Sequence, residues 1–189
     1  MFSTSIYLAS QSPRRRDLLT QIGIKYELLS SEIDESILPN EKPKDYVKRL
    51  AVEKAKAGKN ISTEHKPVLG ADTIVVLDNH IMGKPVDEQH AMAMLLSLSG
   101  REHQVMTAVA LILGDETRCE VVITTVKFRA INEQEALNYW QTNEPKDKAG
   151  GYGIQGIGAQ FVENIDGCYF AVVGLPLMKT QEMLKSLIN

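Results

Sequence analysis

The sequence has no basic excess and no long apolar run, and each absence excludes a class of protein. Its 21 lysines and arginines are outnumbered by 24 aspartates and glutamates, so the formal net charge is −3. A general binder of nucleic acids or of membrane surfaces would carry a surplus of positive charge. No apolar run approaches the roughly 20 residues that a membrane-spanning helix needs. We therefore expect neither a nucleic-acid polymer nor a membrane as partner.

Cysteine is also scarce. The two cysteines, Cys119 and Cys168, lie far apart and fit neither a disulfide framework nor a zinc site. The opening residues MFSTSIYLAS lack the basic and long apolar regions of a signal peptide. These absences favour a cytoplasmic protein in a reducing compartment. The 189 residues suffice for a single domain, 1–189, with a substantial core.

Strand signals alternate with helix signals along the chain, which predicts an α/β fold. Strands are expected at residues 6–9, 24–29, 104–113 and 119–129, and in a pair joined at Asp78-Asn79. Helices are expected from Pro13 to Gly23, over 45–56, 87–98 and 133–141, and from about Pro176 onward. The stretch QFVENIDGCYFAVVG, residues 160–174, predicts a hairpin. Hairpins argue against a purely parallel sheet, so we expect a mixed sheet flanked by helices.

Three arginines follow Ser-Pro in LASQSPRRRDLL, residues 8–19. Positive charge at a helix N-terminus is mildly unfavourable, by roughly a few tenths of a kcal/mol, because that end is already partly positive. The charge is explained if an anion binds there. Backbone N–H groups, the hydroxyls of Ser10 and Ser12, and the guanidinium groups of Arg14 and Arg15 would together hold a phosphate. The alternative is a solvated start of a helix.

Asp72 stands inside the apolar stretch VLGADTIVVLD, residues 68–78. A buried carboxylate is costly unless it is paired or bound to a metal. The functional interpretation is therefore a metal ligand or a general base. The alternative is an aspartate that caps a turn or pairs with a lysine.

Three more charged residues have unusual positions. Lys84 lies in MGKP, at the exit of the strand next to that of Asp72, and Glu35 lies in the acidic loop SEIDES. Lys54 shares a helix face with the apolar Leu50 and Ala51. A solvated loop would explain Glu35, and snorkelling would explain Lys54. The functional interpretation directs Lys54 into a cleft.

Five glycines lie within residues 150–158 of KDKAGGYGIQGIGAQF. Their G-x-G-x-x-G spacing is not a dinucleotide fingerprint, because a strand-like run is expected to follow instead of a helix. No P-loop pattern occurs in the chain. The glycines predict either close approach of the backbone to a ligand or a mobile surface loop. Gln155 is the side chain of IQGIG that can hydrogen-bond specifically.

Four blocks of the sequence together resemble the Maf family of nucleoside triphosphate pyrophosphatases. They are S-x-S-P-R-R-x-x-L-L, G-A-D-T, G-K-P and K-A-G-x-Y-G-I-Q-G, in this order over nearly the whole chain. Within the family the chain is similar to the bacterial dTTP/UTP pyrophosphatase subgroup. The resemblance implies a strongly twisted mixed sheet in two lobes with a deep nucleotide-binding cleft, and a homodimer.

The resemblance also implies roles for individual residues. Asp72 would be the proton acceptor when a nucleoside triphosphate is cut into a monophosphate and pyrophosphate. The other residues implied in the active cleft are Ser10, Arg14, Arg15, Glu35, Lys54 and Lys84. Substrate choice would rest on Arg14, Thr73 and Gln155. Glu35 and Asp72 would hold a divalent cation, Mg²⁺ or Mn²⁺, which oxygen ligands and phosphates favour. Whether Asp72 is base, ligand or both stays open.

Other functions remain as alternatives. A nucleotide- or nucleic-acid-binding protein without catalysis would explain Arg14 and Arg15 but leaves Asp72 and Glu35 without a purpose. A phosphatase or a nucleotidyltransferase would use the carboxylates and a metal, but it would release orthophosphate or transfer the nucleotide. Family roles in cell-division arrest and in removing modified nucleotides rest on no residue of this sequence.

Overall fold

The computed structural model describes residues 5–30 and 32–188. The chain divides into two compact units. Unit 1 comprises Met1–Asp72, Thr107–Val122 and Gly174–Asn189, and unit 2 comprises Thr73–Met106 and Ile123–Val173. No helix in the described part of the chain is long and apolar enough to cross a membrane.

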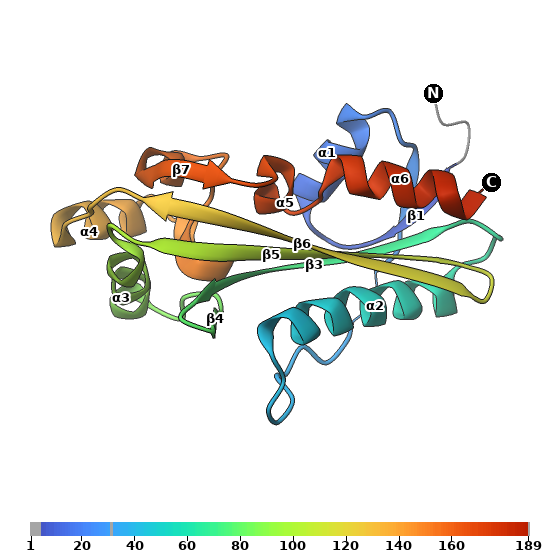
Figure 1. Ribbon diagram of the computed structural model, residues 1–189, viewed down its shortest axis with the longest axis horizontal. Coiled ribbons are helices and arrows are strands. Elements are labelled where there is room, and N and C mark those ends of the chain that lie inside the picture. The colour runs from blue at the N-terminus through green and yellow to red at the C-terminus, as the bar shows by residue number, and fades with distance from the viewer. Residues whose placement is uncertain (1–4, 31, 189) are drawn as a thin grey trace. The chain divides into compact units, whose positions relative to one another are not determined.

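The strands of the described residues form one mixed sheet (Figure 1). They are β1 (Ile6–Ala9), β2 (Tyr26–Leu28), β3 (Val68–Leu77), β4 (His80–Met82), β5 (Glu102–Leu113), β6 (Glu116–Phe128) and β7 (Val162–Asp166). Their order is β2-β1-β3-β5-β6-β7, and β4 pairs with β3. Strand β1 is parallel to both neighbours, whereas β4 and β7 are antiparallel to β3 and β6. The predicted mixed sheet is therefore confirmed.

The described α-helices are α1 (Pro13–Gln21), α2 (Pro43–Ile61), α3 (Glu88–Leu98), α4 (Glu133–Gln141), α5 (Tyr169–Val173) and α6 (Leu177–Ile188). The 3₁₀ helices among the described residues are η1 (Glu144–Asp147), η2 (Ala149–Gly151) and η3 (Ile157–Phe161). Helix α1 begins as predicted, with Ser12 as N-cap residue and Pro13 in the first turn. In unit 1, α2 lies on one side of the strands, and α1 and α6 lie on the other (Figure 1).

Helix α2 is longer than the predicted 45–56 at both ends. Pro43 opens it, which is favourable because proline lacks the N–H that the first helical position leaves unpaired. The helix continues through Gly58, which is buried. A Cβ on Gly58 would lie 2.7 Å from the Cβ of Ala9, so this glycine lets the helix pack closely on β1.

Residues 160–174 do not form the predicted hairpin. Strand β7 pairs with β6 instead, and the chain turns at Gly167 into the short helix α5. The apolar run FAVV buries Ala171 and Val173 from this helix. A short apolar run is compatible with either a strand or a helix, and nothing in this part of the sequence favours one over the other. The Gly-rich stretch is likewise followed by η3 and not directly by a strand.

The packing of α2 on β3 depends on Gly70. A Cβ at this position would lie 2.9 Å from the Ala55 Cα, and closer still to the Ala51 carbonyl oxygen and the Ala55 nitrogen. The backbones of helix and strand are therefore in direct contact. Asp72 is two residues further along β3 and so faces the same side of the sheet. Lys54 precedes Ala55 on α2, so the close packing of α2 on β3 brings Lys54 near Asp72.

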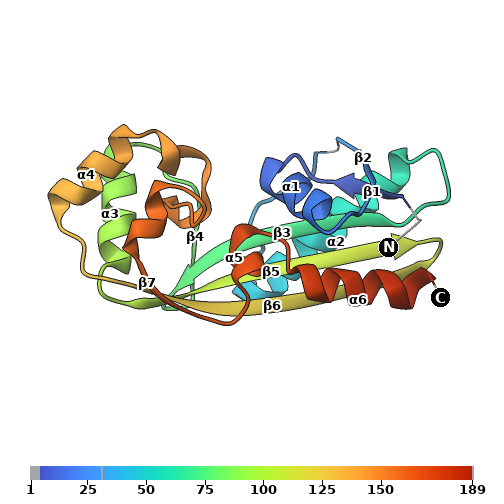
Figure 2. The same cartoon turned by 90° about the horizontal axis from the view of Figure 1, so that it is seen from above.

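The core of unit 2 contains an aromatic cluster around His103, which is 2% exposed. The imidazole packs edge-on against Phe128 and Tyr152, with ring centroids 4.9 and 5.4 Å away. Its Nε2 hydrogen-bonds with the Tyr152 hydroxyl at 2.8 Å. Burial lowers the pKa of His103 to about 4. Helices α3 and α4 lie side by side in this unit (Figure 2).

The lowered pKa of His103 predicts acid sensitivity. Because the unfolded chain binds the proton near pH 6.5 and the folded chain near 4, stability is lost as the pH falls through this window. We expect the free energy of unfolding to fall by roughly 2–3 kcal/mol from this group between pH 7 and pH 4. Denaturant titrations at both pH values on wild type and His103→Gln test this, since glutamine still hydrogen-bonds to Tyr152 but does not titrate. An equal loss in both proteins would contradict the prediction.

Candidate active site

Three of the predicted residues form a chain of ion pairs in unit 1. Lys54 Nζ lies 2.7 Å from Asp72 Oδ1 and 2.7 Å from Glu35 Oε1. The two carboxylate oxygens are therefore at most twice that distance apart. The Asp72 side chain is 11% exposed and that of Glu35 57%, so the chain of charges leads from the protein interior to solvent.

The acidic loop that carries Glu35 is fastened to α2. The Tyr46 hydroxyl donates a 2.8 Å hydrogen bond to the Glu35 carbonyl oxygen. Arg49 donates to the Ser36 carbonyl oxygen at 2.9 Å and to both carboxylate oxygens of Glu41, at 2.6 and 2.8 Å. The loop is therefore anchored to the protein by hydrogen bonds, although the Glu35 side chain is exposed. Its contacts with one helix bring Glu35 to Lys54.

Sequence reasoning did not identify Tyr46 and Arg49 as residues of this region. A signal was available for Tyr46, because it lies eight residues before Lys54 and so shares its helix face. Arg49 offered only its i, i+4 spacing to Glu53, which is common on exposed helices. Its contacts with Glu41 and Ser36 depend on how the loop returns to the helix.

Burial raises the pKa of Asp72 above its ordinary value, although the charges of Lys54 and Arg15 act in the opposite direction. A carboxylate with a raised pKa is a better proton acceptor than a solvated one. The contact with Lys54 agrees both with an aspartate that simply pairs with a lysine and with an aspartate that acts in the reaction. Lys54 itself does not snorkel to solvent, because its ammonium group lies between two carboxylates.

Arg15 is buried, with 8% of its surface exposed. Its Nε donates to the Gly174 carbonyl oxygen and its Nη1 to Ser10 Oγ, both at 2.9 Å. Burial lowers the pKa of Arg15, and the negative charges of Asp72 and Glu35 partly offset this. The structure thus brings Ser10 and Arg15 together, and Arg15 lies within the electrostatic influence of Asp72 and Glu35. Arg14, which is half-buried, precedes Arg15 on the same helix.

The remaining predicted residues, Thr73, Lys84 and Gln155, belong to unit 2. Thr73 is half-buried and follows Asp72 directly on β3, whereas Lys84 and Gln155 are exposed. Gly150 N donates to the Gly83 carbonyl oxygen at 3.0 Å. This bond joins the segment that carries Lys84 to the Gly-rich segment that carries Gln155.

The donor atoms of unit 1 suit a hard cation bound jointly with a substrate. Among residues 5–30 and 32–188, no group of three or more His, Cys, Asp or Glu side chains is arranged to hold a metal ion. Asp72 and Glu35 nevertheless converge on one positive group, the ammonium of Lys54. Mg²⁺ is usually bound by one or two carboxylates together with substrate phosphates and water. Two carboxylates therefore fit such an ion, while a closed protein cage is not formed by the described residues.

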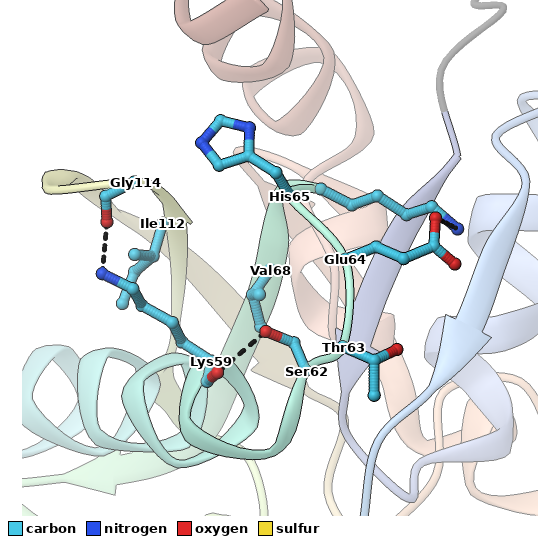
Figure 3. Close-up of a pocket in the computed structure, with 9 residues that line it drawn as sticks. Lys59, Ser62, Thr63, Glu64, His65, Val68, Ile112 and Gly114 are labelled. Carbon is cyan, nitrogen blue, oxygen red and sulfur yellow. Dashed lines mark hydrogen bonds and ion pairs between the residues drawn. The ribbon is translucent and has the colours of Figure 1, made fainter.

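A separate pocket of about 250 Å³ lies at the end of α2 in unit 1 (Figure 3). Its lysines are already engaged: Lys59 Nζ donates to the Gly114 carbonyl oxygen, and Lys66 pairs with Glu27 and Glu64. The lining contains none of the predicted site residues. The pocket is therefore not part of the candidate active site.

The chain belongs to the Maf family, because the family model described as Maf-like protein matches residues 5–187. It is 52% identical over 187 residues to a dTTP/UTP pyrophosphatase of Pseudoalteromonas translucida, covering 99% of both chains. A protein of the same name from Saccharophagus degradans is 52% identical over 185 residues, covering 96% of this chain and 88% of that protein. One from Aliivibrio fischeri is 50% identical over 183 residues, covering 95% and 96%. The family resemblance drawn from four sequence blocks is confirmed.

Proposed function

We propose that this protein is a pyrophosphatase that hydrolyses dTTP and UTP to the nucleoside monophosphate and pyrophosphate. The observation that carries the proposal is the buried Asp72, whose raised pKa suits a proton acceptor and whose position is held by Lys54. The names of the similar proteins, each called dTTP/UTP pyrophosphatase, support this choice of substrate.

In the proposed mechanism, Asp72 orients a water molecule and accepts its proton as the oxygen attacks the α-phosphorus. Lys54 holds the carboxylate through the 2.7 Å contact and stabilises negative charge on phosphoryl oxygens. Arg14, Arg15 and Lys84 neutralise charge on the phosphates, with Ser10 fixing Arg15. Glu35 and Asp72 would hold a divalent cation, Mg²⁺ or Mn²⁺, which stabilises the leaving pyrophosphate when bound.

Base choice is assigned to Gln155, with Arg14 and Thr73 as further residues of substrate selection. Uracil and thymine present an N3–H donor beside an O4 acceptor. The Gln155 amide can meet both, with its carbonyl on N3–H and its NH₂ on O4. Cytosine presents the reverse pattern, so a fixed amide would reject it. Four further properties stay predictions. They are a single Maf-like domain over residues 1–189, a deep nucleotide-binding cleft, a homodimer and a cytoplasmic location.

The experiment that tests the function is product analysis in water enriched in ¹⁸O. We expect dTTP and UTP to yield monophosphate and pyrophosphate, with the label in the monophosphate because water attacks the α-phosphorus. Excess EDTA should abolish turnover, and added Mg²⁺ or Mn²⁺ should restore it. Release of orthophosphate, label in the pyrophosphate, or full activity in EDTA would overturn the proposal.

A further inference from the structure

Within unit 2, two side chains hold the segment that carries Gln155. The Glu144 carboxylate accepts hydrogen bonds from the Gly158 N–H at 3.0 Å and the Ile157 N–H at 2.7 Å. The Tyr139 hydroxyl donates to the same carboxylate at 2.7 Å and accepts from the Gly153 N–H at 3.1 Å. We call residues 153–158 the Gln155 turn. One end of the turn is therefore hydrogen-bonded directly to Glu144, and the other end is linked to Glu144 through the Tyr139 hydroxyl.

Between these hydrogen bonds to Tyr139 and Glu144, the Gln155 turn is closed by a hydrogen bond within its own backbone. Gly156 N donates to the Gly153 carbonyl oxygen at 3.3 Å, so Ile154 and Gln155 are its two central residues. Gln155 is exposed at the tip. An exposed side chain at a free loop tip would sample many positions. Here the backbone on both sides of it is fixed by hydrogen bonds to Tyr139 and Glu144.

The glycines of the turn leave room for these two side chains. A Cβ on Gly158 would lie 2.6 Å from the Tyr139 hydroxyl oxygen, and a Cβ on Gly156 would lie 2.6 Å from the carboxyl carbon of Glu144. A Cβ on Gly153 would lie 2.7 Å from Lys148 Cε and 3.2 Å from Glu144 Oε1. None of the three has a positive φ. The absent side chains of Gly156 and Gly158 therefore allow the close approach of Glu144 and Tyr139, and do not serve an unusual backbone conformation.

We propose that Glu144 and Tyr139 are positioning residues for nucleotide selection, which fix the turn from which Gln155 contacts the pyrimidine. The inference rests on the proposed function, in which Gln155 chooses the base. A bidentate contact discriminates between bases only when its donor and acceptor are held in place. The hydrogen bonds of Tyr139 and Glu144 hold the backbone of the turn, and so fix the position from which the Gln155 amide reaches the base.

The ionised form of Glu144 is the one that suits this role. A carboxylate only accepts hydrogen bonds, and all three of its partners here are donors. Burial raises the pKa of Glu144, but the hydrogen bonds from Gly158, Tyr139 and Ile157 outweigh it, so that the pKa is lowered overall. In Glu144→Gln, one of the two carboxylate oxygens is replaced by an NH₂ group. That group then faces the N–H of Ile157 or of Gly158, whichever way the amide is turned.

The test is a double-mutant cycle with dUTP and dCTP, which share the sugar and the pyrimidine size and differ in their hydrogen-bonding edge. The measured quantity is the ratio of kcat/KM for dUTP over dCTP in wild type, Gln155→Ala, Glu144→Gln and the double mutant. We expect each single variant to lower the ratio about tenfold, because a matched bidentate contact discriminates by roughly tenfold to a hundredfold. The loss for dUTP should fall on KM, with kcat changed by less than about twofold.

The double mutant distinguishes positioning from general damage. If Glu144 acts through Gln155, then Glu144→Gln has no further effect on the ratio once Gln155 is alanine, whereas independent effects would multiply. Glu133→Gln, the same substitution at an exposed residue of α4, is the matched control and should leave the ratio unchanged. Amide exchange of Ile157 and Gly158, followed by NMR, should accelerate in Glu144→Gln and not in the control.

Each failure has a separate meaning. An unchanged ratio in Gln155→Ala contradicts the base-reading role in the proposed function. A lowered ratio in Gln155→Ala with an unchanged ratio in Glu144→Gln overturns only the inference about Glu144, as do independent effects in the double mutant. Should Glu144→Gln not fold, Tyr139→Phe takes its place in the cycle, because it removes the hydroxyl that ties Gly153 and keeps the buried ring.

Discussion

Replacing Asp72 with asparagine is expected to lower kcat by at least about 10²-fold, the low end for loss of general-base catalysis. Asparagine has nearly the same shape, and its Oδ1 can still accept the 2.7 Å hydrogen bond from Lys54. It cannot accept a proton from water, and it carries no charge for a cation. Nucleotide binding through the arginines should change little. The variant therefore separates the reaction from substrate binding.

The same substitution should not destabilise the protein. Because the pKa of Asp72 is raised on folding, its ionised form is disfavoured in the folded state, and stability is lost as the pH rises through that pKa. An uncharged asparagine removes this cost at neutral pH. We expect an equal or higher Tm for Asp72→Asn. A more stable and inactive protein is the pattern of a site in which stability is given up for activity.

Steady-state kinetics with dTTP, binding titrations and thermal unfolding provide the measurements. Asp115→Asn is the matched control, because it is the same substitution at a fully exposed aspartate of unit 1. It should leave both kcat and Tm near the wild-type values. A folded Asp72→Asn protein with kcat within tenfold of wild type would remove Asp72 from the mechanism.

Gly70→Ala is expected to lower the free energy of unfolding by about 3 kcal/mol or more, at or above the usual cost of overpacking a core. The new methyl group would press on backbone atoms of Ala51 and Ala55, which cannot move as a flexible side chain would. Helix α2 must then shift away from β3. Because Lys54 is on that helix and Asp72 on that strand, their contact should lengthen and kcat should fall too.

Urea unfolding of Gly70→Ala and Gly83→Ala provides the comparison. A Cβ at Gly83 would meet no atom within 4 Å, so this second change should cost less than about 1 kcal/mol. The contrast isolates the close contact of helix and strand from the general effect of replacing glycine. Equal stability of the two variants would show that α2 and β3 can separate without cost.

Local signals in the sequence sufficed for many elements. Strand β1 and helix α4 have the bounds that were expected, 6–9 and 133–141. The turn at Asp78-Asn79 is found as predicted, with both residues at positive φ. Such signals lie within a few residues of one another, so no distant contact is needed to interpret them. The family followed from four short blocks for the same reason.

The stretch from Phe170 to Val173 shows where local signals end. Its apolar residues fit a strand as well as a helix, and β7 finds its partner in β6, more than 30 residues earlier in the chain. No residue near Phe170 in the sequence indicates that β7 pairs with β6. The choice of helix α5 over a second strand is therefore a property of the sheet as a whole.

The sequence by itself determined which residues of the site are chemically unusual, because a carboxylate in an apolar strand and a lysine on an apolar helix face need an explanation wherever they lie. Only the tertiary structure decided that they explain each other. Lys54 and Asp72 are separated by a helix end and a turn, and they meet because Gly70 admits α2 against β3. No signal in the sequence indicated the role of Glu144, since its three hydrogen-bond partners are two later backbone amides at the start of η3 and the Tyr139 hydroxyl of the earlier helix α4. Contacts of this kind depend on how backbones pack, and packing is a property of the folded chain.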